Sequence, residues 1–175
     1  MDRKNRRNIG LIGFMATGKT VIGNALATHL HLDFIDTDTV ITEKIGKSIS
    51  EIFSDEGEEV FRKLEREVIQ EVCQTDSHVI SFGGGAVLSQ INVKAIRENN
   101  TVVLLTASSD TISSRIRSSN LRPLLNGNSA TLEDNVRTLL AQREAQYRAA
   151  MDFIIDTERK SVSKIVEEIS GRLQQ

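Results

Sequence analysis

The segment Gly13–Thr20, with the sequence GFMATGKT, constrains the fold of this chain more than any other. It matches the phosphate-loop pattern G-x-x-x-x-G-K-S/T at every fixed position, and it directly follows the apolar run Ile9–Ile12. Apolar residues then recur at helical spacing from Ile22 to Leu30. A strand, a glycine-rich loop and a helix in this order direct successive backbone N–H groups at one anion. A chance glycine-rich turn would need neither flanking element, so the sequence predicts a nucleotide-binding domain.

The residue types within this loop suit phosphate binding. We expect the Lys19 ammonium to reach the terminal phosphates and the Thr20 hydroxyl to ligate Mg²⁺. The backbone of the loop and of the first helical turn supplies further N–H donors. The predicted ATP-binding residues of this segment are Ala16, Thr17, Gly18, Lys19, Thr20 and Val21.

Composition disfavours several classes of partner. The chain has 175 residues, which is most simply one domain, and its formal charge of −2 argues against nucleic acid as a general partner. No stretch approaches the ~18 apolar residues of a membrane span. The single cysteine, Cys73, allows no internal disulfide, fits a reducing compartment, and ends an amphipathic run where a packed thiol is expected. We therefore expect one domain, residues 1–175, that acts as a cytoplasmic monomer on small molecules.

Strand-like and helix-like segments alternate along the rest of the chain. Short runs rich in β-branched residues and bounded by turns are typical of buried parallel strands. Between them lie helical patterns, and Ser48 with Glu51 forms the pattern of a capping box. The predicted strands are Ile9–Ile12, Leu32–Ile35, Val79–Phe82, Thr101–Thr106 and Phe153–Ile155. This alternation predicts a doubly wound α/β fold with ligands beyond the carboxyl ends of the strands.

Two acids, Asp36 and Asp38, follow the second predicted strand. Residues two apart on an extended chain point to the same side, so we expect both carboxylates to face the crevice beside Thr20. One could hold Mg²⁺ through water, a task that falls to Asp36, while the other meets the hydroxyl of an acceptor. A cap on the following helix is the alternative for either acid alone, but the pair beside a phosphate loop favours the functional interpretation.

Three consecutive glycines, Gly83 to Gly85, follow the third predicted strand. Without side chains they leave backbone N–H groups bare, so a small ligand could lie directly against them. A tight turn from strand to helix is the alternative. One glycine would be enough for such a turn, so the triplet favours the floor of a substrate pocket.

Two arginines lie on predicted helices. Arg62 is three residues before Glu65, and a surface salt bridge is the ordinary explanation of that spacing. Arg143 lies on the apolar stripe from Leu132 to Tyr147, where a cation needs a partner. A buried anion such as a substrate carboxylate would provide one, and a guanidinium that snorkels past the edge of the core is the alternative.

The polar stretch Ser118–Ala130 contains the single proline, Pro123, and is the best candidate for a mobile loop. Arg122 in this stretch could contribute positive charge over the phosphate loop, as the arginine of a lid that excludes water. Taken alone, the stretch predicts no more than a loop.

Together these segments resemble the shikimate kinase family. The sequences GFMATGKT, FIDTD, FRKLE, FGGGAV, LRPLL and REAQY occur in the order and approximate spacing of that family, from Ile9 to about Lys160. Many NTPases share the phosphate loop, whereas the later segments are far more specific in combination. The resemblance implies a P-loop kinase fold with a five-stranded parallel sheet of order 2-3-1-4-5, a substrate-binding segment at about 37–66 and a lid at about 117–131.

The resemblance also implies transfer of the ATP γ-phosphoryl group to the 3-hydroxyl of shikimate, with Mg²⁺ as cofactor. Asp38 resembles the acid that meets this hydroxyl and serves as, or orients, the base, and Thr20 and Asp36 resemble the Mg²⁺ shell. The implied catalytic residues are Asp38, Lys19 and Arg122. The implied shikimate-binding residues are Asp38, Arg62, Gly84, Gly85 and Arg143, while Lys160, or Arg159 beside it, is implied to border the adenine.

The chain departs from the family pattern at two positions. Ala16 stands where the family usually has a further glycine, so the backbone there must keep a φ that tolerates a Cβ, and we expect nucleotide binding to survive. Ala145 replaces a proline common shortly after the arginine of REAQY, which favours a straighter helix around Arg143. Neither departure removes a group that does chemistry.

Other functions remain to be distinguished. A gluconate-type kinase shares the loop and sheet but does not need two arginines for one carboxylate together with three glycines. A nucleoside monophosphate kinase usually has a more arginine-rich lid and a longer acceptor segment. A nucleotide-binding regulator without acceptor activity is expected to lack Asp38, Arg62 or Arg143, and all three are present. A GTPase is disfavoured because no N-K-x-D segment occurs.

Overall fold

The central sheet has five parallel strands in the order β2-β3-β1-β4-β5, within the residues that the computed structural model describes, 7–118 and 129–174. The strands are β1 (Asn8–Ile12), β2 (Asp33–Asp36), β3 (His78–Ser81), β4 (Asn100–Thr106) and β5 (Phe153–Asp156). Each predicted strand is present, with ends that shift by no more than one residue. The expected strand order and the doubly wound α/β class are both confirmed.

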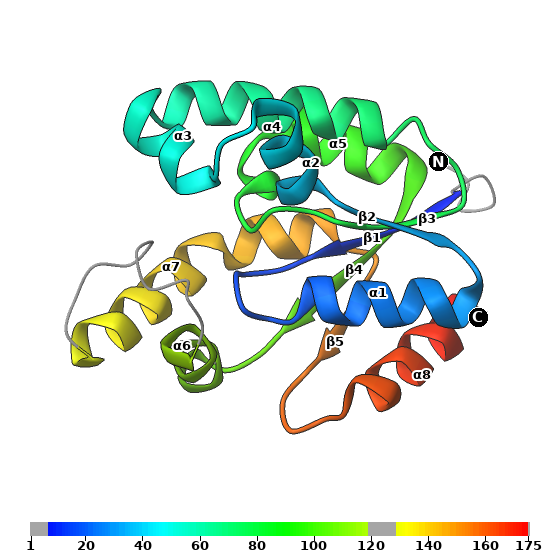
Figure 1. Ribbon diagram of the computed structural model, residues 1–175. Helices are drawn as coiled ribbons and strands as arrows, with labels where there is room; N and C mark the ends of the chain where they lie inside the picture. Colours follow the sequence, from blue (N-terminus) through cyan, green and yellow to red (C-terminus); the bar gives the residue numbers. More distant parts are fainter. Residues whose placement is uncertain (1–6, 119–128, 175) are drawn as a thin grey trace.

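Helices cover both faces of this sheet (Figure 1). The helices are α1 (Lys19–Leu30), α2 (Thr37–Ile45), α3 (Ile49–Asp55), α4 (Glu58–Val72), α5 (Gln90–Asn99), α6 (Ser109–Ser118), α7 (Ser129–Ala150) and α8 (Val162–Leu173), with a 3₁₀ turn, η2 (Ala86–Leu88). Helices α1 and α8 pack together on one face, while α4, α5 and α7 lie on the other. None of the helices in the described ranges is long and apolar enough to cross a membrane.

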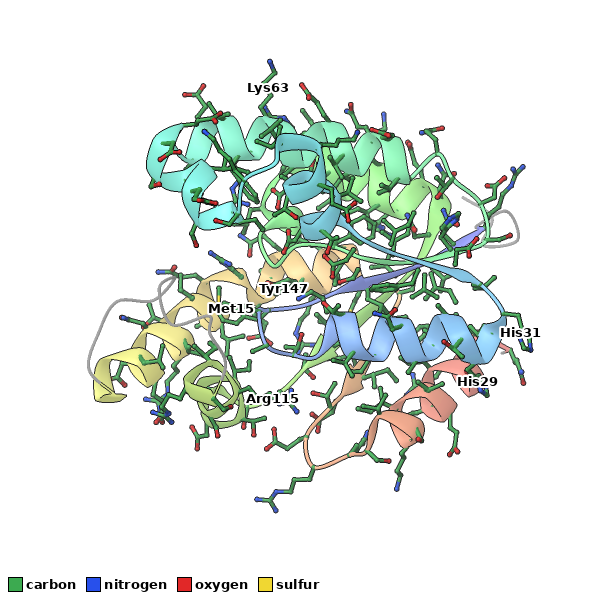
Figure 2. The ribbon with its side chains drawn as sticks, in the orientation of Figure 1. Met15, His29, His31, Lys63, Arg115 and Tyr147 are labelled. Atoms are coloured by element: carbon green, nitrogen blue, oxygen red, sulfur yellow. The ribbon has the colours of Figure 1, made fainter. Side chains whose placement is uncertain are left out.

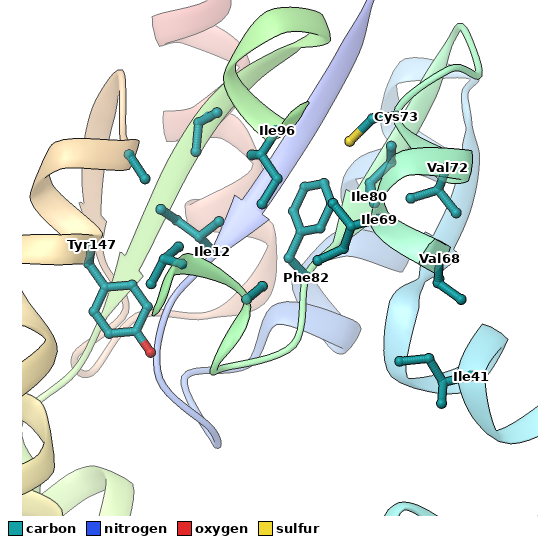
Figure 3. Packing of buried hydrophobic residues seen from close by; sticks show 14 of the residues in the cluster. Ile12, Ile41, Val68, Ile69, Val72, Cys73, Ile80, Phe82, Ile96 and Tyr147 are labelled. Atoms are coloured by element: carbon teal, nitrogen blue, oxygen red, sulfur yellow. The ribbon is translucent and has the colours of Figure 1, made fainter. Parts of the chain in front are cut away.

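The strands are buried on both faces because consecutive side chains enter two different cores. Val79 packs in the core under α1 and α8, while its neighbour Ile80 packs in the core under α4 and α5. The second of these cores also contains Cys73, whose thiol is buried and free, as the sequence predicts (Figure 3). Burial raises the pKa of this thiol to about 11, so it is an inert part of the core.

The capping box predicted before α3 is present. The Glu51 backbone N–H donates to Ser48 Oγ, and the Ser48 backbone N–H donates to Glu51 Oε2 at 2.7 Å. The two bonds satisfy N–H groups that a helix start leaves without partners. They fix where the chain turns into the α3–α4 pair, which contributes residues to the candidate site.

The parallel arrangement brings three loops to one edge of the sheet. The phosphate loop follows β1, Asp36 ends β2, and Gly83 follows β3. Because β3 pairs with both β1 and β2, these three segments are neighbours, although more than 40 residues separate the second from the third in sequence. The carboxyl edge of the sheet therefore carries the candidate site, as expected for a doubly wound fold.

Candidate active site

The phosphate loop keeps its backbone in conformations that few side chains tolerate. Gly13 and Gly18 have φ values of 147° and 97°, and Ala16 has a φ of 60°. For Ala16 this left-handed conformation carries strain of about 1 kcal/mol or more. The Ala16 carbonyl accepts a hydrogen bond of 3.0 Å from Arg115 Nη1, which holds the strained residue in place. Position 16 therefore adopts the conformation that a glycine would favour, despite its Cβ.

The Lys19 side chain folds back over the phosphate loop to which it belongs. Its Nζ donates to the carbonyl oxygens of Gly13 at 2.9 Å and of Phe14 at 3.0 Å. Burial lowers the pKa of Lys19 to about 8, although the nearby carboxylates of Asp38 and Asp36 act to raise it. A buried ammonium at this position is matched to an anionic ligand, because added negative charge would compensate for its lost hydration.

Thr20 and Asp36 are in direct contact. Thr20 Oγ1 donates to Asp36 Oδ2 at 2.8 Å, while Asp36 Oδ1 accepts the backbone N–H of Asp38 at 3.0 Å. Asp36 is therefore the N-cap of α2, which was the alternative interpretation of an acid here, and it also lies beside the phosphate loop. A hydroxyl and a carboxylate oxygen are hard ligands that suit Mg²⁺, which usually takes one or two carboxylates and completes its shell with water and phosphates.

Asp38 lies in the first turn of α2 and not on an extended strand. The prediction that both acids share one side of a strand is therefore wrong in its local geometry: β2 ends at Asp36 and the helix begins at Thr37. The helix turn still directs the Asp38 carboxylate into the crevice. An added Cβ on Gly83 would come within 2.6 Å of Asp38 Oδ1, so this carboxylate lies directly against the glycine turn.

The electrostatic surroundings of Asp38 raise its pKa toward neutrality. Burial and the negative charge of Asp36 raise its pKa to about 6, while the Lys19 ammonium lowers it. Glu65 also raises this pKa and Arg62 also lowers it, so all these groups act on one carboxyl. A carboxylate with a pKa this close to neutrality is suited to accept a proton.

Each glycine of the turn after β3 makes room for a different neighbour. A Cβ on Gly84 would lie 3.3 Å from the backbone nitrogen of Met15, and a Cβ on Gly85 would clash with the guanidinium of Arg62. The Gly83 N–H donates to Thr37 Oγ1 at 3.0 Å, and both groups are buried. Sequence reasoning named all three glycines as a pocket floor but missed Thr37 and its contact with Gly83. Their contact joins positions 46 residues apart, which no local pattern reveals.

Arg62 is held by two acids of its own helix. Its Nη1 donates to Glu65 Oε2 at 3.0 Å, so the predicted pair is present although Glu65 is not at the surface, and its Nη2 donates to Glu58 Oε1 at 3.1 Å. The Glu65 side chain is only 2% exposed, and burial raises its pKa, although Arg62 acts to lower it. Glu65 is a site residue that the sequence did not reveal, because one more acid in a helix rich in charges looks like an exposed one.

Arg143 lies on α7, opposite the helix that carries Arg62. Its guanidinium carbon is 5.7 Å from the centre of the Phe14 ring in the phosphate loop, a cation–π contact. The apolar stripe around it is confirmed, since Leu132, Val136 and Tyr147 are all buried. Helix α7 also runs without interruption through Ala145, as the missing proline predicts. Arg143 is half-buried, and no carboxylate among the described residues forms an ion pair with it.

Tyr147 and Arg115 are two further residues that the sequence did not single out for the site. Tyr147 Oη donates to the Gly84 carbonyl oxygen at 2.6 Å, which attaches α7 to the glycine turn. Arg115 Nη1 connects α6 to the Ala16 carbonyl and, at 3.5 Å, to Thr157 Oγ1 after β5. Figure 2 labels both residues, Tyr147 on α7 and Arg115 on α6.

The remaining predicted residues fall at the edge of the site or outside the described ranges. Val21 is 62% exposed at the start of α1. Lys160 Nζ pairs with Glu168 Oε2 of α8 at 2.7 Å, while Arg159 lines a surface hollow together with Thr111 and Glu158. Arg122 and most of the predicted lid, 117–131, lie outside the described residues.

The fold and this arrangement define a class: a P-loop kinase for a small molecule, with the candidate phosphate-binding and acceptor-binding groups at one edge of a parallel sheet. The shikimate kinase sequence profile matches residues 15–174. The shikimate kinase of Caldanaerobacter subterraneus subsp. tengcongensis is 42% identical over 166 residues, which cover 93% of this chain and 94% of that protein. The chain belongs to the shikimate kinase family.

Solved structures of the family have the same fold. A shikimate kinase from Acinetobacter baumannii, in complex with shikimate, superimposes with a TM-score of 0.91 at 31% identity, covering 97% of this chain and 93% of that one. A shikimate kinase from Bacteroides thetaiotaomicron gives a TM-score of 0.89, also at 31% identity, with 97% and 99% of the two chains covered. The similarity extends over the whole chain and is not confined to the phosphate loop.

Proposed function

We infer that this chain is a shikimate kinase, which transfers the γ-phosphoryl group of ATP to the 3-hydroxyl of shikimate and yields shikimate 3-phosphate and ADP. Beyond family membership, one observation carries this inference. Arg62 lies against a glycine turn that also contacts Asp38, and Arg143 lies over the Phe14 ring of the adjacent phosphate loop. Two guanidinium groups beside a bare backbone floor suit a small ring that bears a carboxylate.

In the proposed mechanism Asp38 accepts or directs the proton of the attacking hydroxyl. Its pKa of about 6 keeps it mostly ionised at neutral pH and still basic enough to take a proton in the transition state. Lys19 and Arg122 neutralise the charge that spreads over the transferring phosphoryl oxygens. Thr20 and Asp36 would hold Mg²⁺, which when bound supplies positive charge to the phosphate oxygens.

The two substrates are assigned to different residues. We assign the ATP phosphates to the backbone and side chains of Ala16 to Val21, and the edge of the adenine to Lys160 or Arg159. We assign shikimate to Asp38, Arg62 and Arg143, with Gly84 and Gly85 as the floor beneath its ring. The segment 37–66, which contains Asp38 and Arg62, is the proposed substrate-binding segment. We further propose that the enzyme works as a cytoplasmic monomer and needs neither nucleic acid nor a membrane.

The decisive experiment measures ADP release from Mg·ATP with and without shikimate in one coupled assay. We expect a rate with shikimate far above the ATPase background, and no comparable rate with gluconate or a nucleoside monophosphate. Mass spectrometry of the product tests the position of the phosphate, and light scattering tests the monomer. Background hydrolysis alone, with ATP still bound, would retain the nucleotide site and overturn the proposed acceptor.

A further inference from the structure

A buried tyrosine attaches α7 to the glycine turn. Tyr147 is 4% exposed, and its hydroxyl donates to the Gly84 carbonyl oxygen at 2.6 Å. Figure 3 shows its ring on α7 with the hydroxyl directed toward the loops that follow β1 and β3. Burial raises the pKa of Tyr147 to about 12, so the hydroxyl keeps its proton and remains a donor throughout the neutral range.

Arg143 lies one helical turn before this tyrosine, on the same face of α7. Its guanidinium acts on the Tyr147 hydroxyl through its positive charge, which lowers the pKa that burial raises. The same guanidinium lies over the Phe14 ring at 5.7 Å. Tyr147 and Arg143 therefore lie on the face of α7 that meets the glycine turn and the phosphate loop.

The floor has little freedom to follow α7 if this attachment is lost. Gly84 is backed by the phosphate loop, because an added Cβ would lie 3.3 Å from Met15 N and 3.7 Å from the Gly13 carbonyl oxygen. One side of the turn is thus in contact with the phosphate loop, and the Gly84 carbonyl is bound by the tyrosine. The hydroxyl bond then fixes where α7, and with it Arg143, lies relative to the floor.

We propose that Tyr147 is a positioning residue for acceptor binding: through its hydrogen bond to Gly84 it fixes the turn of α7 that carries Arg143, and so holds the guanidinium where the acceptor carboxylate must meet it. The proposal rests on the proposed function, since it assigns Arg143 to that carboxylate. Tyr147 itself touches neither substrate, and its effect is exerted through Arg143.

The substitution Tyr147→Phe tests this proposal because it removes one oxygen and keeps the ring that packs in the core. We expect the KM for shikimate to rise about 3- to 10-fold, as for the loss of one buried hydrogen bond, while the KM for ATP and kcat change less than about twofold. The specific readout is an acceptor in which a neutral amide replaces the carboxylate. With that acceptor, kcat/KM should be equal for the wild type and the variant.

Ser170→Ala is the matched control, since Ser170 Oγ also donates to a backbone carbonyl from a buried position, at 2.8 Å, but far from the site in α8. It should leave both KM values unchanged. The double variant Tyr147→Phe with Arg143→Ala should be no worse than Arg143→Ala alone.

Three outcomes would overturn the proposal. Equal loss with shikimate and with its amide would show that Tyr147 acts on the floor or on stability. Parallel rises in both KM values, with a fall in Tm beyond that of Ser170→Ala, would make the tyrosine merely structural. Additive effects in the double variant would separate it from Arg143. If the wild type itself showed no shikimate-dependent ADP release, the proposed function would fail first, and the two failures are thus distinguishable.

Discussion

The phosphate loop and the proposed acceptor-binding groups lie at the same edge of the sheet, but they are assembled in different ways. The donor side comes from one continuous segment, Gly13 to Thr20, and relies mainly on backbone groups and Lys19. The acceptor side combines side chains from α2, α4 and α7 around the turn after β3. Local conformation is therefore enough to build the first, whereas only the packed core holds the second together.

The two arginines also differ in how far the protein itself compensates their charge. Arg62 is already paired with Glu58 and the buried Glu65, so its charge is compensated by the protein. Arg143 rests on an aromatic ring and has no carboxylate partner among the described residues. A substrate carboxylate would thus gain more from Arg143, and Arg62 would mainly contribute orientation.

The largest expected effect tests whether catalysis at the acceptor can be lost while ATP binding is kept. Asp38→Asn should lower kcat by about 10²- to 10⁴-fold, because the amide cannot accept the proton, and should leave ATP binding nearly intact. Single-turnover kinetics and calorimetric titration with a nonhydrolysable ATP analogue measure the two properties. Full activity of this variant would contradict the role of Asp38 as base.

A second large effect should appear only on the acceptor side. Arg143→Ala should raise the KM for shikimate by about 10- to 100-fold, since a charge-assisted pair is lost, and change the KM for ATP far less. Steady-state kinetics with each substrate varied in turn gives both values. Equal rises in the two KM values would place Arg143 elsewhere in the mechanism.

The pH dependence of the free enzyme should follow Asp38. Its carboxylate is the active form and its pKa is raised to about 6, so kcat/KM for shikimate should fall about tenfold per pH unit below 6. Above about 8 kcat/KM for ATP, which reports the nucleotide-free enzyme, should fall as Lys19 loses its proton. Carbon-13 NMR titration, assigned by comparison with Asp38→Asn, measures the carboxyl directly. A midpoint near 4 would refute the argument from burial.

A smaller effect is expected when either of the two acids that pair with Arg62 is neutralised. Glu65→Gln should raise the KM for shikimate about 3- to 10-fold, because the buried partner that orients the guanidinium loses its charge. Glu58→Gln is the matched control, with a side chain 67% exposed, and should change this KM less than about twofold. Kinetics of both variants at one ionic strength makes the comparison. Equal effects would show that burial does not separate the two pairs.

The smallest effect concerns the donor side. Ala16→Gly should stabilise the fold by up to about 1 kcal/mol, because it relieves a left-handed alanine with φ 60°, and should change the KM for ATP by no more than about threefold. Ala145→Gly in the middle of α7 is the contrast and should destabilise by about 1 kcal/mol. Urea unfolding of both variants tests the pair. Destabilisation by Ala16→Gly would mean that the strain at this position is negligible.

The difference between the two sides also explains which parts of the site could be predicted. Short-range patterns located the five strands, the phosphate loop and the capping box, since each reflects local conformation or the periodicity of burial. The same reasoning placed Asp38 on an extended strand, because it could not see where β2 stops and the N-cap bond of Asp36 begins α2. The predicted direction of the Asp38 carboxylate is nevertheless right, because the first turn of α2 directs it into the same crevice.

The sequence by itself determined the class of fold, the nucleotide-binding loop and, through several motifs in order, the family. Only the tertiary structure decided which groups meet: Thr37 with Gly83, Arg62 with Gly85, and Tyr147 with Gly84. The physical reason is the sequence separation between the groups that determine each feature. Backbone conformation is set by neighbours within a few residues, whereas contacts between segments 46 and 63 residues apart exist only once the sheet has aligned its strand ends.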